Sequence, residues 1–207
     1  DRRLHDLLEF LHVSPSEAKH RDTIRVIGGA LHTIVGHAEG LMAAPGHYFQ
    51  QGGLIVQIVT DPRGETRVIP LTKTGLQLTL TKLATWQRFD KRSDDWYDID
   101  APVGHSAALL EAPEYRRLPP LLALTRQPFI RPDGTVCQSS GYDPATFLYG
   151  VFNPRQFPVN SKPTLEQARA ALDRLSSLLD GFEFKSPSDF AAALSAILTA
   201  TVRTSLS

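Results

Sequence analysis

The stretch from residue 118 to residue 152 constrains the fold more than any other, because it holds the densest run of turn-forming residues in the chain. Pro-Asp-Gly at 132–134 predicts a turn, since proline presets φ, aspartate can bond the backbone ahead, and glycine tolerates positive φ. Gly-Tyr-Asp-Pro at 141–144 predicts a second turn. The residues of the two turns are Pro132, Asp133, Gly134, Gly141, Tyr142, Asp143 and Pro144.

Between the two turns, residues 135–138 are just long enough for one short strand. Apolar runs at residues 129–130 and 147–152 stand on either side and can pair with this strand. The stretch therefore predicts a small β-meander.

The order of motifs in this stretch carries a resemblance. Leu-Pro-Pro-Leu at 118–121 is followed by Pro-Phe-Ile-Arg-Pro-Asp-Gly-Thr at 128–135 and Gly-Tyr-Asp-Pro-Ala-Thr at 141–146. This order resembles the region just before the ATPase domain in primase-helicase-type replication proteins of phages, plasmids and integrative elements. In that family the last motif continues with Gly-Leu. Phe147 stands here at the position of the glycine, so we expect the turn after Thr146 to differ.

Two further segments are similar to the same family. Residues 47–56 resemble its Tyr-x-Arg-Gly-Gly-x-Leu-Val pattern through Gly52 and Gly53, with Gln51 in place of the arginine. Residues 191–207 resemble the helix that leads to the phosphate-binding loop. The resemblance implies that this chain lies directly before a helicase-type ATPase domain. Its first residue is Asp1 rather than methionine, and we expect a fragment of a longer protein.

Composition narrows the setting of the chain. With 207 residues, of which 42% are hydrophobic and 21% charged, it can bury a core and fits one domain or two small ones. The single cysteine, Cys137, excludes an internal disulfide and favours a reducing, cytoplasmic location. No apolar run approaches the roughly 20 residues that span a bilayer, so no membrane partner is expected.

Periodicity and turn residues predict helices, a hairpin, a helix, a small β region and further helices, which is an α+β class. Helices are predicted at 1–13, 14–44 with a break near Gly28, 74–89, 105–112, 163–180 and 190–203, a hairpin at 54–59 and 66–70, and a loop at 91–102. We divide the chain into a helical segment at 1–45, an α+β core at 46–153 and C-terminal helices at 154–207.

Basic residues gather in two groups in the sequence, the first at residues 82–92 and the second at residues 116–131, with aromatic residues nearby. Phosphate contacts and base stacking together bind single-stranded nucleic acid, whereas a solvated charged face over core aromatics is the alternative. The formal net charge of zero, from 22 basic and 22 acidic residues, means that any DNA contact must come from such a local patch. The candidate contacts are Lys82, Trp86, Arg88, Lys91, Arg92, Arg116, Arg117, Arg126 and Arg131.

Four aspartates lie close together at positions 94, 95, 98 and 100. Asp98 and Asp100 have the Asp-x-Asp spacing by which two carboxylates on a strand share a divalent metal. The flanking sequence is typical of a loop, so a solvated acidic loop is the favoured interpretation and no metal site is predicted. The Gly-x-x-x-x-Gly-Lys-Ser/Thr pattern of a phosphate-binding loop is also absent, and no cofactor or ATP hydrolysis is expected of this fragment.

The leading hypothesis is a non-catalytic accessory domain of a mobile-element DNA replication protein. It would bind or guide DNA, assemble the adjacent ATPase domain of the same chain, or both, and it could form a homo-oligomer. One alternative is a primase-like, metal-dependent nucleotidyl-transfer domain that uses residues 94–100. The other is a purely structural oligomerisation module.

Overall fold

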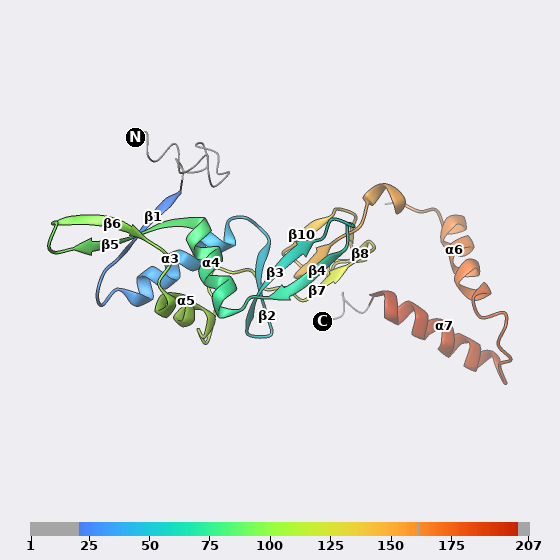
Figure 1. Cartoon of the computed structure of the whole chain (residues 1–207). Coiled ribbons are helices and arrows are strands. Elements are labelled where there is room, and N and C mark those ends of the chain that lie inside the picture. The colour runs from blue at the N-terminus through green and yellow to red at the C-terminus, as the bar shows by residue number, and fades with distance from the viewer. Residues whose placement is uncertain (1–20, 161, 203–207) are drawn as a thin grey trace. The chain divides into compact units, whose positions relative to one another are not determined.

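The computed structural model describes residues 21–160 and 162–202, and it confirms the predicted α+β class (Figure 1). The helix predicted at 1–13 and the start of the next one lie outside the described residues. The chain divides into two compact units, Asp1–Pro120 and Leu121–Ser207. The boundaries that we predicted after residues 45 and 153 do not coincide with this division.

The first unit contains a three-stranded sheet in the order β1-β5-β6. Strand β1 (Asp22–Val26) runs parallel to β5 (Ala84–Asp90), and β5 runs antiparallel to β6 (Asp95–Ile99). This sheet corrects three predictions, because residues 22–26 and 84–89 were predicted as helix and residues 95–99 as loop. In β1 and in the first half of β5 a more buried position alternates with a more exposed one, which is the period of a strand.

Three helices cover one face of this sheet: α3 (Leu31–Ala43), α4 (Lys73–Leu83) and α5 (Val103–Leu110). The break near Gly28 is present, since Gly29 has a φ of 81° and α3 begins two residues later. Helix α4 ends where Ala84 turns to extended backbone. The side chains that pack between helices and sheet include Ile24, Ile34, Met42, Leu76, Leu80, Trp86 and Leu109.

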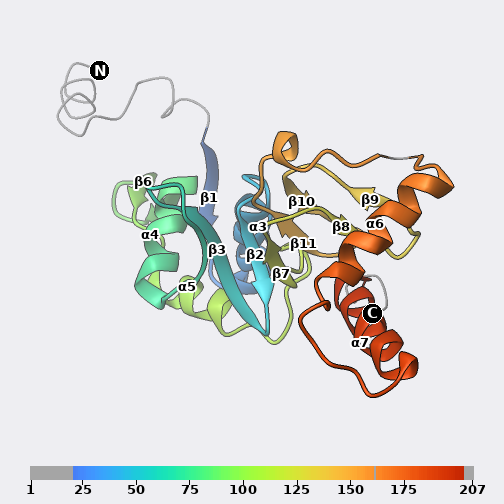
Figure 2. The same ribbon diagram turned by 90° about the vertical axis from the view of Figure 1, so that its right-hand side faces the viewer.

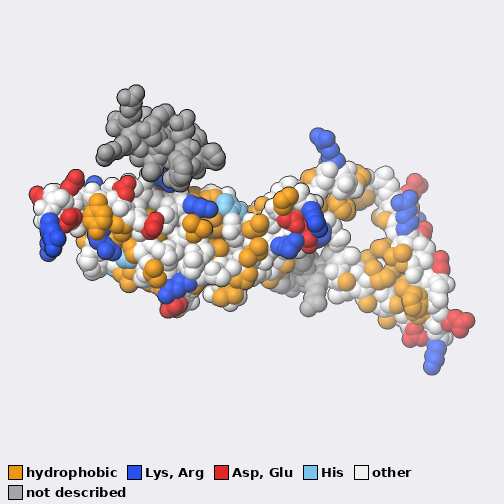
Figure 3. All heavy atoms as spheres, viewed as in Figure 1, with side chains coloured by type: hydrophobic (Ala, Val, Ile, Leu, Met, Phe, Trp, Pro, Cys, Tyr) orange, Lys and Arg blue, Asp and Glu red, His pale blue; other side chains and the backbone are white. Residues whose placement is uncertain are grey.

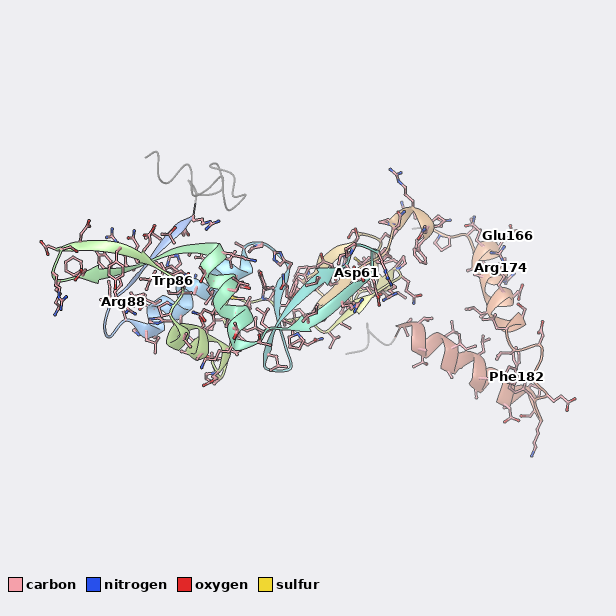
Figure 4. The ribbon with its side chains drawn as sticks, in the orientation of Figure 1. Asp61, Trp86, Arg88, Glu166, Arg174 and Phe182 are labelled. Atoms are coloured by element: carbon pink, nitrogen blue, oxygen red, sulfur yellow. The ribbon has the colours of Figure 1, made fainter. Side chains whose placement is uncertain are left out.

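The predicted hairpin is confirmed as β3 (Leu54–Thr60) and β4 (Thr66–Pro70). The structure adds a strand, β2 (Tyr48–Gln51), which lies antiparallel beside β3 (Figure 2). Gly52 and Gly53 join these two strands with φ of 57° and 79°, the positive values that a two-residue hairpin turn requires. At the other turn, the carboxylate of Asp61 accepts the N–H groups of Arg63 and Glu65 (Figure 4).

The segment from residue 113 to residue 120 is anchored to α3 and β2 by two side chains. Oε1 of Glu39 accepts the backbone N–H groups of Arg117 and Leu118 at 2.6 and 3.0 Å. Nε2 of Gln50 donates to the carbonyls of Tyr115 and Leu118 at 3.1 and 2.8 Å. Because buried backbone polar groups need partners, these bonds make an irregular segment compatible with a buried position.

In the second unit, the turn-rich stretch forms two small sheets rather than one meander. Strand β8 (Phe129–Ile130) pairs with β9 (Val136–Cys137) across the predicted Pro-Asp-Gly turn. The other sheet has the order β10-β11-β7, so residues 148–150 pair with 141–143 and 123–125 and not with 135–138. Its strands are β7 (Ala123–Thr125), β10 (Gly141–Asp143) and β11 (Leu148–Gly150).

The Gly-Tyr-Asp-Pro motif does not itself form the predicted turn, because Gly141 to Asp143 is strand and the turn follows it. Asp143 is 6% exposed, and its Oδ1 accepts from Nε and Nη2 of Arg131 while its Oδ2 accepts from the hydroxyl of Thr146. The hydrogen bonds from Arg131, with help from Thr146, hold the pKa of Asp143 below its ordinary value although burial opposes this. The aspartate therefore ties the β8–β9 hairpin to the turn before β11.

Phe147 ends this turn with a φ of 57°, in the left-handed region. A phenylalanine pays a steric cost there that glycine does not. The backbone at this position therefore suits glycine better than phenylalanine.

The described residues after β11 form a short connector and two helices. A 3₁₀ turn at Pro154–Gln156 lies in the connector, and it is followed by α6 (Leu165–Ser177) and α7 (Pro187–Val202). Both predicted helices are confirmed. Thr164 and Gln167 form a capping box at α6, and Ser186 accepts the N–H of Asp189 at α7. Neither helix contains a buried residue.

Candidate nucleic-acid interface

The β5–β6 hairpin of the first unit carries three of the predicted DNA contacts, Arg88, Lys91 and Arg92, and all three side chains are exposed. Lys91 and Arg92 lie in the turn, which is closed by Asp90 accepting the N–H of Arg92 at 2.9 Å. Asp94 completes the turn with a φ of 55°. Figure 1 shows the distal part of the hairpin extending past the helices of this unit.

Trp86 is not available for base stacking, contrary to our prediction. It is 1% exposed, it packs in the core of the first unit, and its Nε1 donates to the carbonyl of Leu80 at 3.0 Å. Figure 4 shows Trp86 and Arg88 along the same strand. Tyr115 is also a core residue, with its hydroxyl bonded to the carbonyl of Leu110.

The face of the sheet opposite the helices carries a different set of side chains, which lie next to one another across the three strands: Arg25, Gln87, Phe89, Trp96 and Asp98. Charged, polar and apolar side chains are mixed at the end of the first unit that the β5–β6 hairpin forms, at the left of Figure 3.

The contacts on this face join all three strands. The guanidinium carbon of Arg25 lies 4.7 Å from the centroid of a ring of Trp96, a cation–π geometry. The rings of Phe89 and Trp96 meet edge to face at 5.4 Å. Gln87 accepts from Arg25 at 3.5 Å and donates to Oδ1 of Asp98 at 3.0 Å.

Arg88 lies on the other face of β5, opposite Tyr97 of β6. The pKa of His105 on α5 is lowered, mainly by burial and secondly by the positive charge of Arg88. Lys82 is exposed in the last turn of α4. Lys82 and Arg88 therefore lie on the side of the sheet that the helices cover, and Lys91 and Arg92 lie in the turn of the hairpin.

The second predicted basic group does not form one patch within a unit. Arg116 and Arg117 belong to the first unit, and Arg126 and Arg131 to the second. Arg116 pairs with Glu114 at 2.6 Å, and the side chain of Arg117 lies against Gly40 of α3. Arg131 forms an ion pair with Asp143, with Nη2 at 2.8 Å from Oδ1.

The acidic cluster is not the loop that we predicted, because Asp95 and Asp98 lie on β6 and Asp100 follows its end. Oδ1 of Asp95 accepts the N–H of Trp96, and Oδ1 of Asp98 accepts from Gln87. Within residues 21–160 and 162–202, no three His, Cys, Asp or Glu side chains come together as a metal ligand set.

Arg25 and Gln87 were missed by the sequence reasoning. The alternation of Thr23-Ile24-Arg25-Val26, with two β-branched apolar residues on one side, was the available signal for a strand. The strand was not recognised because Ile24 also stands at helical spacing with Ile27 and Leu31.

No helix in the described part of the chain is long and apolar enough to cross a membrane. Comparison of the chain with protein-family models, with curated proteins and with solved structures gave no match.

Proposed function

We propose that this chain is a non-catalytic accessory domain of a mobile-element DNA replication protein of the primase-helicase type. In this proposal it precedes a helicase-type ATPase domain in the parent chain, acts in the cytoplasm, and binds or guides DNA with the β5–β6 hairpin of its first unit. The observation that supports it best is the hairpin itself. It presents Lys91 and Arg92 at its turn, next to a sheet face with two aromatic rings, and Arg88 on the opposite face.

The charges of the hairpin are close to balanced, because Asp90, Asp94, Asp95 and Asp98 accompany the three basic residues. The basic residues at the turn can contact phosphates, and each such contact releases counterions and makes the affinity depend on salt. The nearby carboxylates limit this attraction. We therefore expect moderate affinity that is measurable at low salt and weakens as salt rises.

The test is the binding of a fluorescent single strand and of a duplex of the same sequence at two salt concentrations. We expect Lys91→Ala/Arg92→Ala to weaken binding and to reduce the slope of log K against log salt by about 1.4 for the single strand, which is about 0.7 for each lost contact. The matched control is Arg63→Ala/Lys73→Ala, which removes two exposed charges elsewhere in the first unit. Equal weakening in both double variants, or no binding at low salt, would contradict the proposal.

A role in assembly is the second candidate, and it is favoured by the apolar side chains of the C-terminal helical region. Leu165, Leu178 and Phe182 are each about two-thirds exposed, at 66%, 65% and 67% (Figure 4 labels Phe182). Large apolar side chains that remain exposed can belong to an interaction surface. Light scattering over a range of concentrations tests this role, since a dimer or ring that forms without DNA would favour it.

A further inference from the structure

We propose that the face of the β1-β5-β6 sheet bearing Arg25, Phe89 and Trp96 stacks the unpaired bases of a single-stranded nucleic acid. The inference rests on the proposed function and names the ligand of its hairpin more closely. It selects single strands over duplexes, and it places the bases on a surface distinct from the turn that contacts phosphates.

The aromatic rings are the first support. Phe89 is 38% exposed and Trp96 is half-buried, although both belong to a sheet whose other face supplies the core. The two rings meet edge to face on adjacent strands, and part of the Phe89 side chain is exposed to solvent. Stacking of a base on such a ring stabilises the complex and accepts any base, because every base has a π-face.

Arg25 supplies the second support. Its guanidinium group lies over the Trp96 ring and is held by Gln87, so it is oriented before any ligand arrives. Arginine planes stack on bases, and their N–H groups donate to phosphate or to base edges. The row of Arg25, Gln87 and Asp98 crosses the three strands and places polar groups next to the rings.

The charges of the hairpin favour the binding of a single strand over that of a duplex. A duplex presents phosphates to a protein and keeps its bases stacked on one another, so it would bring its phosphates near the carboxylates of the hairpin without gaining any stacking on Phe89 and Trp96. A single strand can place its bases on Phe89 and Trp96 while its backbone passes Lys91 and Arg92. The near balance of charge therefore disfavours the duplex more than the single strand.

Tyr97 provides a matched control on the same strand. It is 47% exposed, it lies between Trp96 and Asp98 in sequence, and it belongs to the opposite face, across from Arg88. Replacing it removes an exposed aromatic ring of the hairpin without changing the proposed stacking face.

The experiment measures the fluorescence anisotropy of three labelled DNA probes of equal length on the whole chain. The probes are an oligothymidine strand, an abasic strand with the same phosphates, and a duplex. We expect the oligothymidine to bind at least tenfold more tightly than the other two. Phe89→Leu/Trp96→Leu should remove this advantage, and Tyr97→Leu should keep it.

Intrinsic fluorescence provides a second readout, because the chain has two tryptophans and Trp86 is buried. Oligothymidine should quench the native protein, and Trp96→Phe should bind with similar affinity without the quenching.

Two results would overturn the inference, and they differ in what they imply for the proposed function. If the abasic strand binds as tightly as oligothymidine and both depend on Lys91 and Arg92, the hairpin contacts DNA but does not stack bases. If no probe binds at low salt, both the stacking face and the DNA-binding function are wrong.

Discussion

Arg131 and Asp143 are joined by two hydrogen bonds, from Nε at 3.0 Å and from Nη2 at 2.8 Å, that both end on the same carboxylate oxygen. The other oxygen of Asp143 accepts from Thr146 at 2.7 Å. The segments Pro-Phe-Ile-Arg-Pro-Asp-Gly and Gly-Tyr-Asp-Pro-Ala-Thr thus meet through these side chains.

Replacing Arg131 by methionine should destabilise the second unit by about 2 kcal/mol, because a buried carboxylate loses its charged partner. Cys137 is the only cysteine of the chain and is buried in this unit, so its reaction with a thiol reagent reports local opening. We expect the reaction to be about 30-fold faster in Arg131→Met. Arg126→Met, at an exposed position of the same unit, is the control and should react at the native rate.

Acid should destabilise the second unit through Asp143. Its pKa is lower in the folded than in the unfolded chain, so its contribution is fully present above the unfolded value of about 3.9 and is lost as the pH falls through the folded value. Urea unfolding followed by far-ultraviolet circular dichroism between pH 6 and pH 2.5 measures this loss. Asp143→Asn should have a lower stability at pH 6 and a flatter dependence on pH. An unchanged slope would show that other carboxyl groups determine it.

Position 147 should be more stable with glycine than with alanine. Both substitutions remove the Phe147 ring, which is 45% exposed, but only glycine adopts the φ of 57° without steric cost. The difference between Phe147→Gly and Phe147→Ala should be about 1 kcal/mol in favour of glycine. Thermal unfolding of the two variants measures it, and a more stable alanine variant would argue against strain at this position.

Replacing Glu39 should lower the stability of the first unit, by an amount that depends on the hydrogen bonds that its carboxylate accepts. Glu39→Leu leaves the N–H groups of Arg117 and Leu118 without their acceptor and should cost about 2–3 kcal/mol, whereas Glu39→Gln keeps an oxygen and should cost about 1 kcal/mol. Both tryptophans belong to this unit, so their fluorescence in urea follows its unfolding. Glu114→Gln, which changes an exposed carboxylate, is the control.

The local features of the fold were predictable from the sequence. The hairpin at 54–70 has its Asp-Pro-Arg-Gly turn, and the two C-terminal helices have their caps, so neighbouring residues determine these elements. The β1-β5-β6 sheet was not predictable in this way. Its central strand follows α4 without a loop, and the leucines of the helix continue into Ala84 at helical spacing.

The candidate site was predicted in part. Proximity in sequence identified Arg88, Lys91 and Arg92, which the structure places on one hairpin. It could not separate Trp86 from Phe89, because only pairing with β1 and β6 determines which face of β5 is covered by helices. Arg25 reaches Trp96 only through that pairing.

The parallel alignment of β1 with β5 also has a consequence for how the first unit folds. Arg25 and Gln87 are 62 positions apart, whereas the β5–β6 and β3–β4 hairpins close over short turns. Contacts between distant residues form slowly, because a long loop must close before they are gained. The hairpins should therefore form early and β1 should dock late. Because the cation–π contact needs β1 in place, only a chain that has completed this last step presents the whole stacking face.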